Sequence, residues 1–330
     1  MGDIREILKA RILVLDGAMG TMLQAYNFTE EDYRGVLFKD WKYPVKGNND
    51  MLSITQPTAI KEVHRKYFAV GADIVETNTF SSTTIAMADY HMEDYVYQLN
   101  FESAKIAKEV ADEFTKVNPD KPRFVAGSIG PTNKTASMSP DVNDPGYRAV
   151  SFDELRIAYK QQAEALLDGG VDLLLVETVF DTLNAKAALF AIEEIKEERS
   201  IDIPVILSGT ITDASGRTLS GQTAEAFLIS VSHVPLLAIG LNCALGASAL
   251  VPYLKIISEN TCFGVSAHPN AGLPNAFGAY DESPEQMASQ IKEYLDKNLV
   301  NIIGGCCGTT PAHIKAIADL AANYKPREIV

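Results

Sequence analysis

Three cysteines stand where their thiols could bind one metal ion. Cys306 and Cys307 are adjacent in the glycine-rich run GGCCGTTP, and Cys243 lies in GLNCALG, just after an apolar run. Zinc prefers tetrahedral sulfur and nitrogen ligands, and its catalytic sites use three protein ligands and leave the fourth position to water or substrate. The three thiols therefore predict a zinc site with one open position.

Adjacent cysteines have other interpretations: a vicinal disulfide, two ordinary core residues, or a glycine-rich loop that binds phosphate. Neighbouring residues of a regular strand point to opposite faces, so both thiols can reach one ion only where the backbone leaves strand geometry. Gly304, Gly305 and Gly308 supply that freedom. The phosphate interpretation needs no cysteine and leaves Cys243 unexplained.

Eight short apolar or β-branched runs, separated by helical patterns, predict eight strands at 12–15, 74–76, 124–126, 172–176, 204–207, 236–240, 263–266 and 301–303. This alternation predicts a (β/α)8 TIM barrel that forms one domain over residues 1–330. Ser151 and Glu154 are expected to cap a helix that ends at Gly169. Two Ser/Thr-Pro pairs, at 283–284 and 310–311, predict further helix starts.

The long connections follow strands rather than helices, which makes the C-terminal mouth of the barrel the functional face. They cover residues 21–56, 128–150, 210–222 and 268–283. The three thiols are expected at this mouth, because Cys243 follows the sixth strand and the cysteine pair follows the eighth. Cys262 is expected at the opposite end as an inert thiol, buried or half-buried.

Other polar residues are expected around the same mouth. Asp16 and Glu177 end the first and fourth strands, where they could hold an ammonium group, act as acid and base, or form structural ion pairs. The loop that begins with Gly17 and Ala18 offers backbone N–H groups to a carboxylate, or is a plain turn. His268 is expected to enter a mouth loop as a hydrogen-bonding residue or a ligand.

Two asparagines at the mouth are further candidates. Asn242 stands beside Cys243, and Asn270 lies in HPNAG. Their amides could orient or ligate a substrate, although asparagine is also a common turn residue.

Composition excludes several function classes. There are 29 basic and 43 acidic residues, a formal charge of −14 that argues against nucleic-acid and anionic-membrane partners. We find no apolar stretch near the roughly 20 residues that span a bilayer, and no signal-peptide core. Four cysteines in 330 residues do not suggest a disulfide framework, so a reducing cytoplasm is expected.

Taken together, the motifs resemble the homocysteine-binding module of cobalamin-dependent methionine synthases over nearly the whole chain. GLNCALG and GGCCGTTPAHI are typical of the wider zinc-dependent homocysteine methyltransferases, and GPTNKTASMSPDV and TITDASGRTLSGQT favour the cobalamin branch. The other matching strings are LDGAMGTMLQ, NNDMLSITQP, GADIVETNTF, ETVFDTLNAKAA and HPNAGLPNAFGAYD. One departure is His268, where the family more often has tyrosine before PNAGLP.

The resemblance implies a zinc ion on Cys243, Cys306 and Cys307, with homocysteine sulfur in the fourth position. Asp16 and Glu177 would then bind the substrate ammonium and the loop at 17–18 its carboxylate. Asn270 would cap zinc when substrate is absent.

The implied methyl donor is methylcobalamin, replenished from 5-methyltetrahydrofolate. The sequence shows no cobalamin motif of the DxHxxG type and no folate-binding barrel. Cobalamin and folate are therefore expected to be bound by separate modules or by another chain.

Three alternatives remain open from the sequence. One is a stand-alone homocysteine S-methyltransferase that uses S-methylmethionine or betaine. A second is a zinc- or homocysteine-binding module without turnover. The third is a phosphate-binding barrel of aldolase type.

Overall fold

The chain folds into a closed parallel barrel. The computed structural model describes residues 2–212, 215–276 and 278–329; Asp213, Ala214 and Phe277, in two of the long connections, lie outside the described residues. Eight parallel strands form one sheet in the order β1-β8-β7-β6-β5-β4-β3-β2. A bridge from Leu15 to Ile74 joins the first strand to the second. The predicted (β/α)8 TIM barrel is confirmed.

All eight predicted strands are present: β1 Leu13–Val14, β2 Ile74–Glu76, β3 Phe124–Ile129, β4 Leu173–Val179, β5 Val205–Gly209, β6 Ala238–Gly246, β7 Gly264–Asn270 and β8 Ile302–Ile303. Several run further toward the mouth than predicted, because polar residues and glycines there still pair with neighbouring strands. Asn242 pairs with His268, and Gly246 pairs with Asn270. Cys243 and His268 therefore lie inside strands, not in the connections that follow them.

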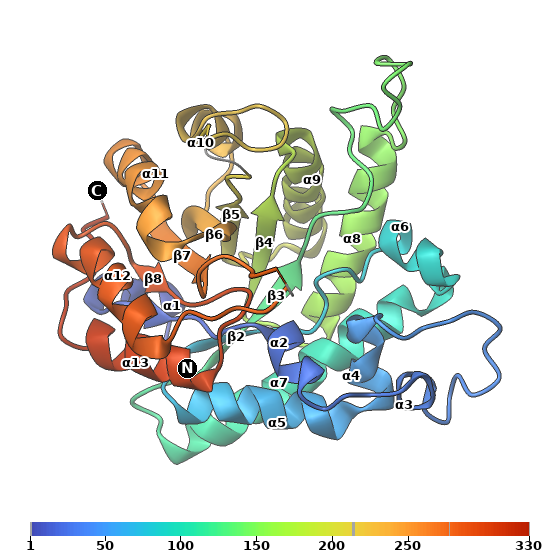
Figure 1. The fold of residues 1–330 in the computed structure, drawn as a ribbon, viewed down its shortest axis with the longest axis horizontal. Coiled ribbons are helices and arrows are strands. Elements are labelled where there is room, and N and C mark those ends of the chain that lie inside the picture. The colour runs from blue at the N-terminus through green and yellow to red at the C-terminus, as the bar shows by residue number, and fades with distance from the viewer. Residues whose placement is uncertain (1, 213–214, 277, 330) are drawn as a thin grey trace.

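Helices surround the sheet, and the loop after β3 projects beyond the end of α8 (Figure 1). Ser151 and Glu154 form the predicted capping box, and α8 ends just before Gly169. Ser283 and Thr310 cap α12 and α13 as expected. The helices are α1 Ile4–Ala10, α2 Met19–Gln24, α3 Glu30–Arg34, η1 Asn49–Met51, α4 Leu52–Thr55, α5 Pro57–Ala69, α6 Thr84–Met87, η2 Ala88–Tyr90, η3 Glu93–Tyr95, α7 Val96–Val117, α8 Phe152–Asp168, α9 Thr182–Arg199, α10 Ala224–Val231, α11 Ala247–Asn260, α12 Pro284–Asp296 and α13 Pro311–Ala321.

The bottom of the barrel is filled and closed by apolar side chains. Ile4 and Leu8 of α1 join the cluster of strand side chains that includes Leu13, Phe124 and Leu175. A larger cluster packs the outer face of the sheet against the surrounding helices. Because the N-terminal end is closed, small molecules can reach the barrel centre only from the C-terminal mouth.

Residues 21–56 form a separate wall beside that mouth. They contain parts or all of α2, α3, η1 and α4, and their apolar side chains, such as Phe38, Met51 and Leu52, pack with Val96 and Leu99 of α7. This small second core explains why the excursion is ordered despite its length.

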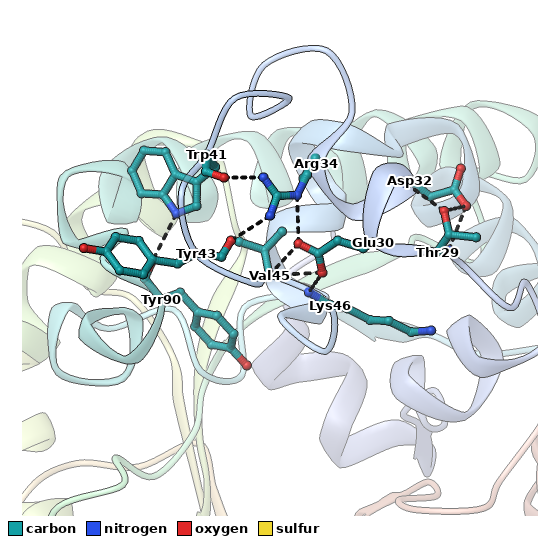
Figure 2. Close-up of polar contacts among 9 residues, drawn as sticks. All are labelled: Thr29, Glu30, Asp32, Arg34, Trp41, Tyr43, Val45, Lys46 and Tyr90. Carbon is teal, nitrogen blue, oxygen red and sulfur yellow. Dashed lines mark hydrogen bonds and ion pairs between the residues drawn. The ribbon is translucent and has the colours of Figure 1, made fainter.

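Glu30 fixes the shape of this wall (Figure 2). Its carboxylate accepts hydrogen bonds from the backbone N–H groups of Val45, at 3.0 Å, and Lys46, at 2.8 Å, and from Arg34 Nε at 2.8 Å. Arg34 in turn donates to the carbonyl oxygens of Trp41 and Tyr43. Burial opposes ionisation of Glu30, but these donors outweigh it and lower its pKa.

Two sequence expectations concern the surface. Cys262 lies at the bottom of the barrel as expected, but its side chain is exposed, so the prediction of a buried or half-buried thiol is wrong. It lies in a bend just before β7. Within the described residues, no helix has the length and hydropathy that a bilayer crossing requires.

Replacing Glu30 with alanine should lower the free energy of unfolding by about 1–3 kcal/mol, because two backbone N–H groups and Arg34 lose their acceptor. Glu31→Ala is the matched control: Glu31 is exposed and lies in the same helical turn, so a change below about 0.5 kcal/mol is expected. Urea unfolding followed by circular dichroism measures both. Equal losses in the two variants would attribute the effect to the helix terminus instead.

Candidate metal and substrate site

The three predicted metal ligands meet at the mouth of the barrel. Cys243 lies in β6, and Cys306 and Cys307 follow β8. Their Sγ atoms all lie within 4.8 Å of one another, and those of Cys243 and Cys307 are 3.7 Å apart. All three are free thiols, so the vicinal disulfide is not formed. Three soft sulfur donors at this spacing suit zinc.

Irregular backbone brings the thiols together. Cys243 and Ala244 have φ values of 58° and 51°, in the left-handed region, and the β6–β7 register shifts between Asn242 and Gly246. After β8, Gly308 has φ 79°, and a Cβ atom there would lie 2.3 Å from the Cβ of Tyr280. A side chain at 308 would therefore be excluded twice, by conformation and by contact.

The thiols compete for protons. Hydrogen bonds from Cys243 and Cys306 lower the pKa of Cys307 to about 3. Hydrogen bonds with Cys243 and Cys307, together with burial, raise the pKa of Cys306 well above its usual range. The cluster thus holds one thiolate readily and resists the next two, and a bound cation would allow all three to ionise.

Two buried asparagines contact the cysteines. The Asn242 oxygen accepts from the Thr178 N–H at 3.0 Å and the Ser208 hydroxyl at 2.7 Å. Its nitrogen donates to Thr178 Oγ1 at 2.8 Å and lies 3.9 Å from Cys306 Sγ. The Asn270 oxygen accepts from the Cys307 N–H at 3.1 Å.

The structure places both asparagines next to the cysteines. Asn242 and Asn270 are buried, and neither contributes to the cavity wall formed by the described residues. Both polar atoms of the Asn242 amide have partners, and the Asn270 oxygen is bonded to the Cys307 backbone. Both side chains therefore contact the cysteine loop, and their roles toward substrate and zinc stay predictions.

Three carboxyl groups converge beside the thiols. Asp16 and Glu177 are buried, and Glu76, at the end of β2, is half-buried. Asp16 Oδ2 accepts from the Glu76 N–H at 3.2 Å, and Glu177 Oε1 accepts from the Ser128 hydroxyl at 2.5 Å. Burial raises the pKa of Glu177 to about 7, and burial with mutual repulsion raises those of Asp16 and Glu76. A cation placed among them would favour the ionised forms.

His268 belongs to the same cluster. A ring nitrogen lies within 4.8 Å of a carboxylate oxygen of both Glu76 and Glu177. The side chain is 1% exposed, and burial lowers the pKa of His268 to about 3, so the imidazole is neutral. The histidine thus faces the carboxyl groups from the opposite strand of the barrel.

The loop after Asp16 is tied to the cysteine loop. The Ala18 N–H donates to Thr309 Oγ1 at 3.1 Å, and the Thr309 hydroxyl donates to the Cys306 carbonyl at 2.6 Å. A Cβ atom at Gly17 would lie 2.6 Å from Thr309 Oγ1. The Ala18 amide, expected to receive a carboxylate, is therefore already bonded to a side chain.

The three thiols, the three carboxyl groups, His268 and the loop at 17–18 line one cavity of about 980 Å³. Its inner end holds the thiols, the carboxyl groups and His268. Its outer end is bounded by residues 47–50, 77–81, 86–90 and 131–133. The volume is at the upper end for small-molecule sites and can hold two reactants side by side.

Asp50 is the buried acid of the outer end. Its carboxylate accepts from the Ser81 N–H at 2.7 Å and the Ser82 hydroxyl at 3.0 Å. Burial raises the pKa of Asp50 to about 6.

The sequence analysis missed Glu76, Asp50 and Thr309. Glu76 carried a usable signal, because it ends a predicted strand as Asp16 and Glu177 do. Asp50 lies in the 21–56 excursion, whose path the sequence does not determine, and Thr309 acts through a contact with a residue 291 positions away.

The sequence and fold correspond to a known class of barrel, the methyltransferases that act on homocysteine. The family model described as homocysteine S-methyltransferase matches residues 13–321, so the chain belongs to that family and is an enzyme of this kind. The phosphate-binding and non-catalytic alternatives are thereby set aside.

Solved structures agree in fold. The metallated form of the homocysteine methyltransferase MmuM from Escherichia coli is 25% identical, with 96% of this chain and 98% of that chain covered at a TM-score of 0.73. The oxidised form of the same enzyme is 24% identical, with coverages of 93% and 95% and a TM-score of 0.72.

Asp50→Asn should remove part of the pH dependence of stability. The folded-state pKa of Asp50, about 6, exceeds its ordinary value of 3.8. The stabilisation by the protonated acid is therefore fully present below about pH 3.8 and is lost as the pH rises through about 6. The free energy of unfolding should fall by ~1–3 kcal/mol over this range. Relative to wild type, the variant should gain stability over this window.

Thermal unfolding measured from about pH 4 to about pH 8, a range that brackets the titration of Asp50, tests this gain. The control Asp89→Asn changes an exposed acid of the same cavity and should keep the wild-type pH dependence. Parallel profiles for wild type and Asp50→Asn would contradict the assigned burial of this carboxyl group.

Proposed function

We propose that this chain binds zinc on Cys243, Cys306 and Cys307 and presents homocysteine to methylcobalamin, so that methionine is formed. The observation that carries the proposal is that three cysteine sulfurs and three carboxyl groups share one cavity wall in a homocysteine S-methyltransferase. The sulfur ligands would hold a metal ion that activates the substrate thiol, and the carboxyl groups would bind the substrate amino group.

The donor set fits zinc. Three thiolates satisfy its preference for tetrahedral sulfur coordination and leave a position open toward the cavity. When bound, zinc would favour the ionised form of the homocysteine thiol, whose pKa near ~8.5 otherwise leaves little thiolate at neutral pH. Asn242 and Asn270 hold the cysteine loop in place during this chemistry.

The amino-acid head group would lie on the other side of the cavity's inner end. Asp16 and Glu177 are assigned to its ammonium group, and Glu76 adds a third carboxyl. The loop at Gly17 and Ala18 is the candidate for the carboxylate, which would share the Ala18 amide with Thr309. Held at both ends, the substrate keeps its sulfur aimed at the outer cavity.

Methyl transfer needs no base from the chain once the thiol is ionised. The sulfur forms a bond to the methyl carbon, and the bond from that carbon to the donor breaks with its electron pair remaining on the donor. Positioning of both reactants within the cavity is the contribution of the protein.

The support for methylcobalamin is the resemblance of GPTNKTASMSPDV and TITDASGRTLSGQT to the cobalamin branch. Cobalamin- and folate-binding modules on another part of the protein or another chain are the proposed partners. Thiols must stay reduced to bind zinc, which supports a reducing, cytoplasmic location.

A second candidate donor is a small methylated cation, S-methylmethionine or betaine. The outer cavity carries the carboxyl groups of Asp50 and Asp89 and the rings of Phe80 and Tyr90. Carboxylates and aromatic rings are the groups that bind sulfonium and quaternary ammonium ions.

Each of Cys243→Ala, Cys306→Ala and Cys307→Ala should lose stoichiometric zinc, because two thiolates with water bind the ion far more weakly. Cys262→Ala is the control and should keep it, since its thiol is exposed at the other end of the barrel. Metal content after dialysis against a mild chelator measures this. Full zinc retention in any of the first three would contradict that ligand.

Zinc-loaded protein with homocysteine should demethylate free methylcobalamin and form methionine. Loss of the methyl–cobalt absorbance and chromatography of methionine measure the reaction, with S-methylmethionine and betaine in parallel and Cys243→Ala as the zinc-free control. Turnover with the small cations alone would make the second candidate donor correct and the cobalamin assignment wrong.

A further inference from the structure

Two buried polar atoms on the cavity wall have no hydrogen-bond partner within the described part of the chain. They are Asp16 Oδ1 and His268 Nε2. Buried polar atoms are almost always paired in folded proteins, because an unpaired one loses its water contacts without compensation. Other unpaired buried atoms exist in this chain, such as those of His64 and Gln162, but they do not line the cavity. A ligand is the natural partner for the two that do.

Both residues line the same cavity, and each neighbours the glutamate pair Glu76 and Glu177. Asp16 follows β1, and its other carboxylate oxygen bonds the Glu76 N–H. A ring nitrogen of His268 lies within 4.8 Å of oxygens of Glu76 and Glu177. The neutral imidazole therefore adds an uncharged acceptor to an acidic cluster, from β7 on the other side of the barrel.

We propose that His268 accepts a hydrogen bond from the ammonium group of the amino-acid substrate. An ammonium group carries three N–H donors, and the wall supplies three kinds of acceptor: Asp16 Oδ1, a glutamate oxygen and His268 Nε2. This inference rests on the proposed function, which places that ammonium group at Asp16 and Glu177. It makes His268 a determinant of specificity for a free amino group.

A divalent metal ion is the competing occupant, because two carboxylates and a histidine also form a metal-ligand set. The contacts favour a monovalent cation. Glu76 and Glu177 hydrogen-bond to each other, so one of them keeps a proton. Glu177 also accepts from Ser128, and Asp16 from the Glu76 amide. A divalent ion would have to displace this proton, whereas an ammonium group can donate to neutral and ionised carboxyl oxygens alike.

The test compares two thiols that differ only in the amino group, L-homocysteine and 4-mercaptobutanoate. Binding of each to the zinc-loaded chain is measured by calorimetry for wild type, His268→Phe and His268→Gln. We expect His268→Phe to weaken the binding of homocysteine by about tenfold, or ~1.4 kcal/mol, and to leave the affinity for 4-mercaptobutanoate unchanged. His268→Gln should recover most of the loss, because its amide oxygen is again an acceptor.

Each other outcome overturns the inference. Equal weakening of both thiols in His268→Phe would show a merely structural role, and no weakening would show that the imidazole does not touch the ammonium group. A second equivalent of bound metal in wild type that disappears in His268→Phe would make the cluster a metal site.

Asp16→Asn separates this inference from the proposed function. If it also leaves the preference for homocysteine unchanged, the ammonium group binds elsewhere and the proposed function of the acidic cluster fails. If Asp16→Asn abolishes the preference and His268→Phe does not alter it, only the role of His268 fails.

Discussion

The site depends on one buried amide, that of Asn242. It bonds the Thr178 backbone and hydroxyl at β4 and the Ser208 hydroxyl of β5, and it lies against the Cys306 sulfur after β8. Thr178 has φ 55°, which a β-branched residue tolerates only when its surroundings hold it there. Because Thr178 directly follows Glu177, the same amide that lies against a thiol also holds the irregular end of β4, where the register shifts and a carboxyl group lines the cavity. The sulfur side and the acidic side of the cavity are thus one hydrogen-bonded structure.

Both sides are assembled from groups that repel one another when ionised. Proximity makes the second and third thiols hard to ionise, and burial does the same for Asp16 and Glu177. A positive charge would relieve each cluster, and in the function proposed above it is a metal ion for the sulfurs and an ammonium group for the carboxyl groups. A fold that carries such uncompensated sites gains stability when they are filled, so ligand binding and folding are linked through the same residues.

Periodicity and caps were sufficient to predict the barrel, because buried parallel strands are apolar runs and helix starts have local signals such as Ser151 with Glu154. The same signals were sufficient to place the three thiols at the mouth of the barrel, since the C-terminal ends of its strands lie on one face. The strand extensions that carry His268 and Asn270 could not be predicted, because their pairing depends on neighbouring strands and not on their own composition. The roles of Asn242 and Thr309 arise from contacts between residues far apart in sequence, and the exposure of Cys262 depends on how its turn packs.

The 21–56 wall connects the inner site to the space where a donor must stand. At one end Thr21 accepts a hydrogen bond from the Gly308 N–H, next to the cysteine pair. At the other, Trp41 donates to the Tyr90 carbonyl, on the outer rim of the cavity (Figure 2). Hydrogen bonds of Glu30 and Arg34 fix the chain between these two points, so the wall has a defined structure. Since α1 closes the bottom of the barrel, a methyl donor has to enter through the mouth, which this wall borders on one side. The distance between sulfur and methyl carbon is therefore set by how the outer rim receives the donor, and the chemistry of the inner site can stay the same for donors of different size.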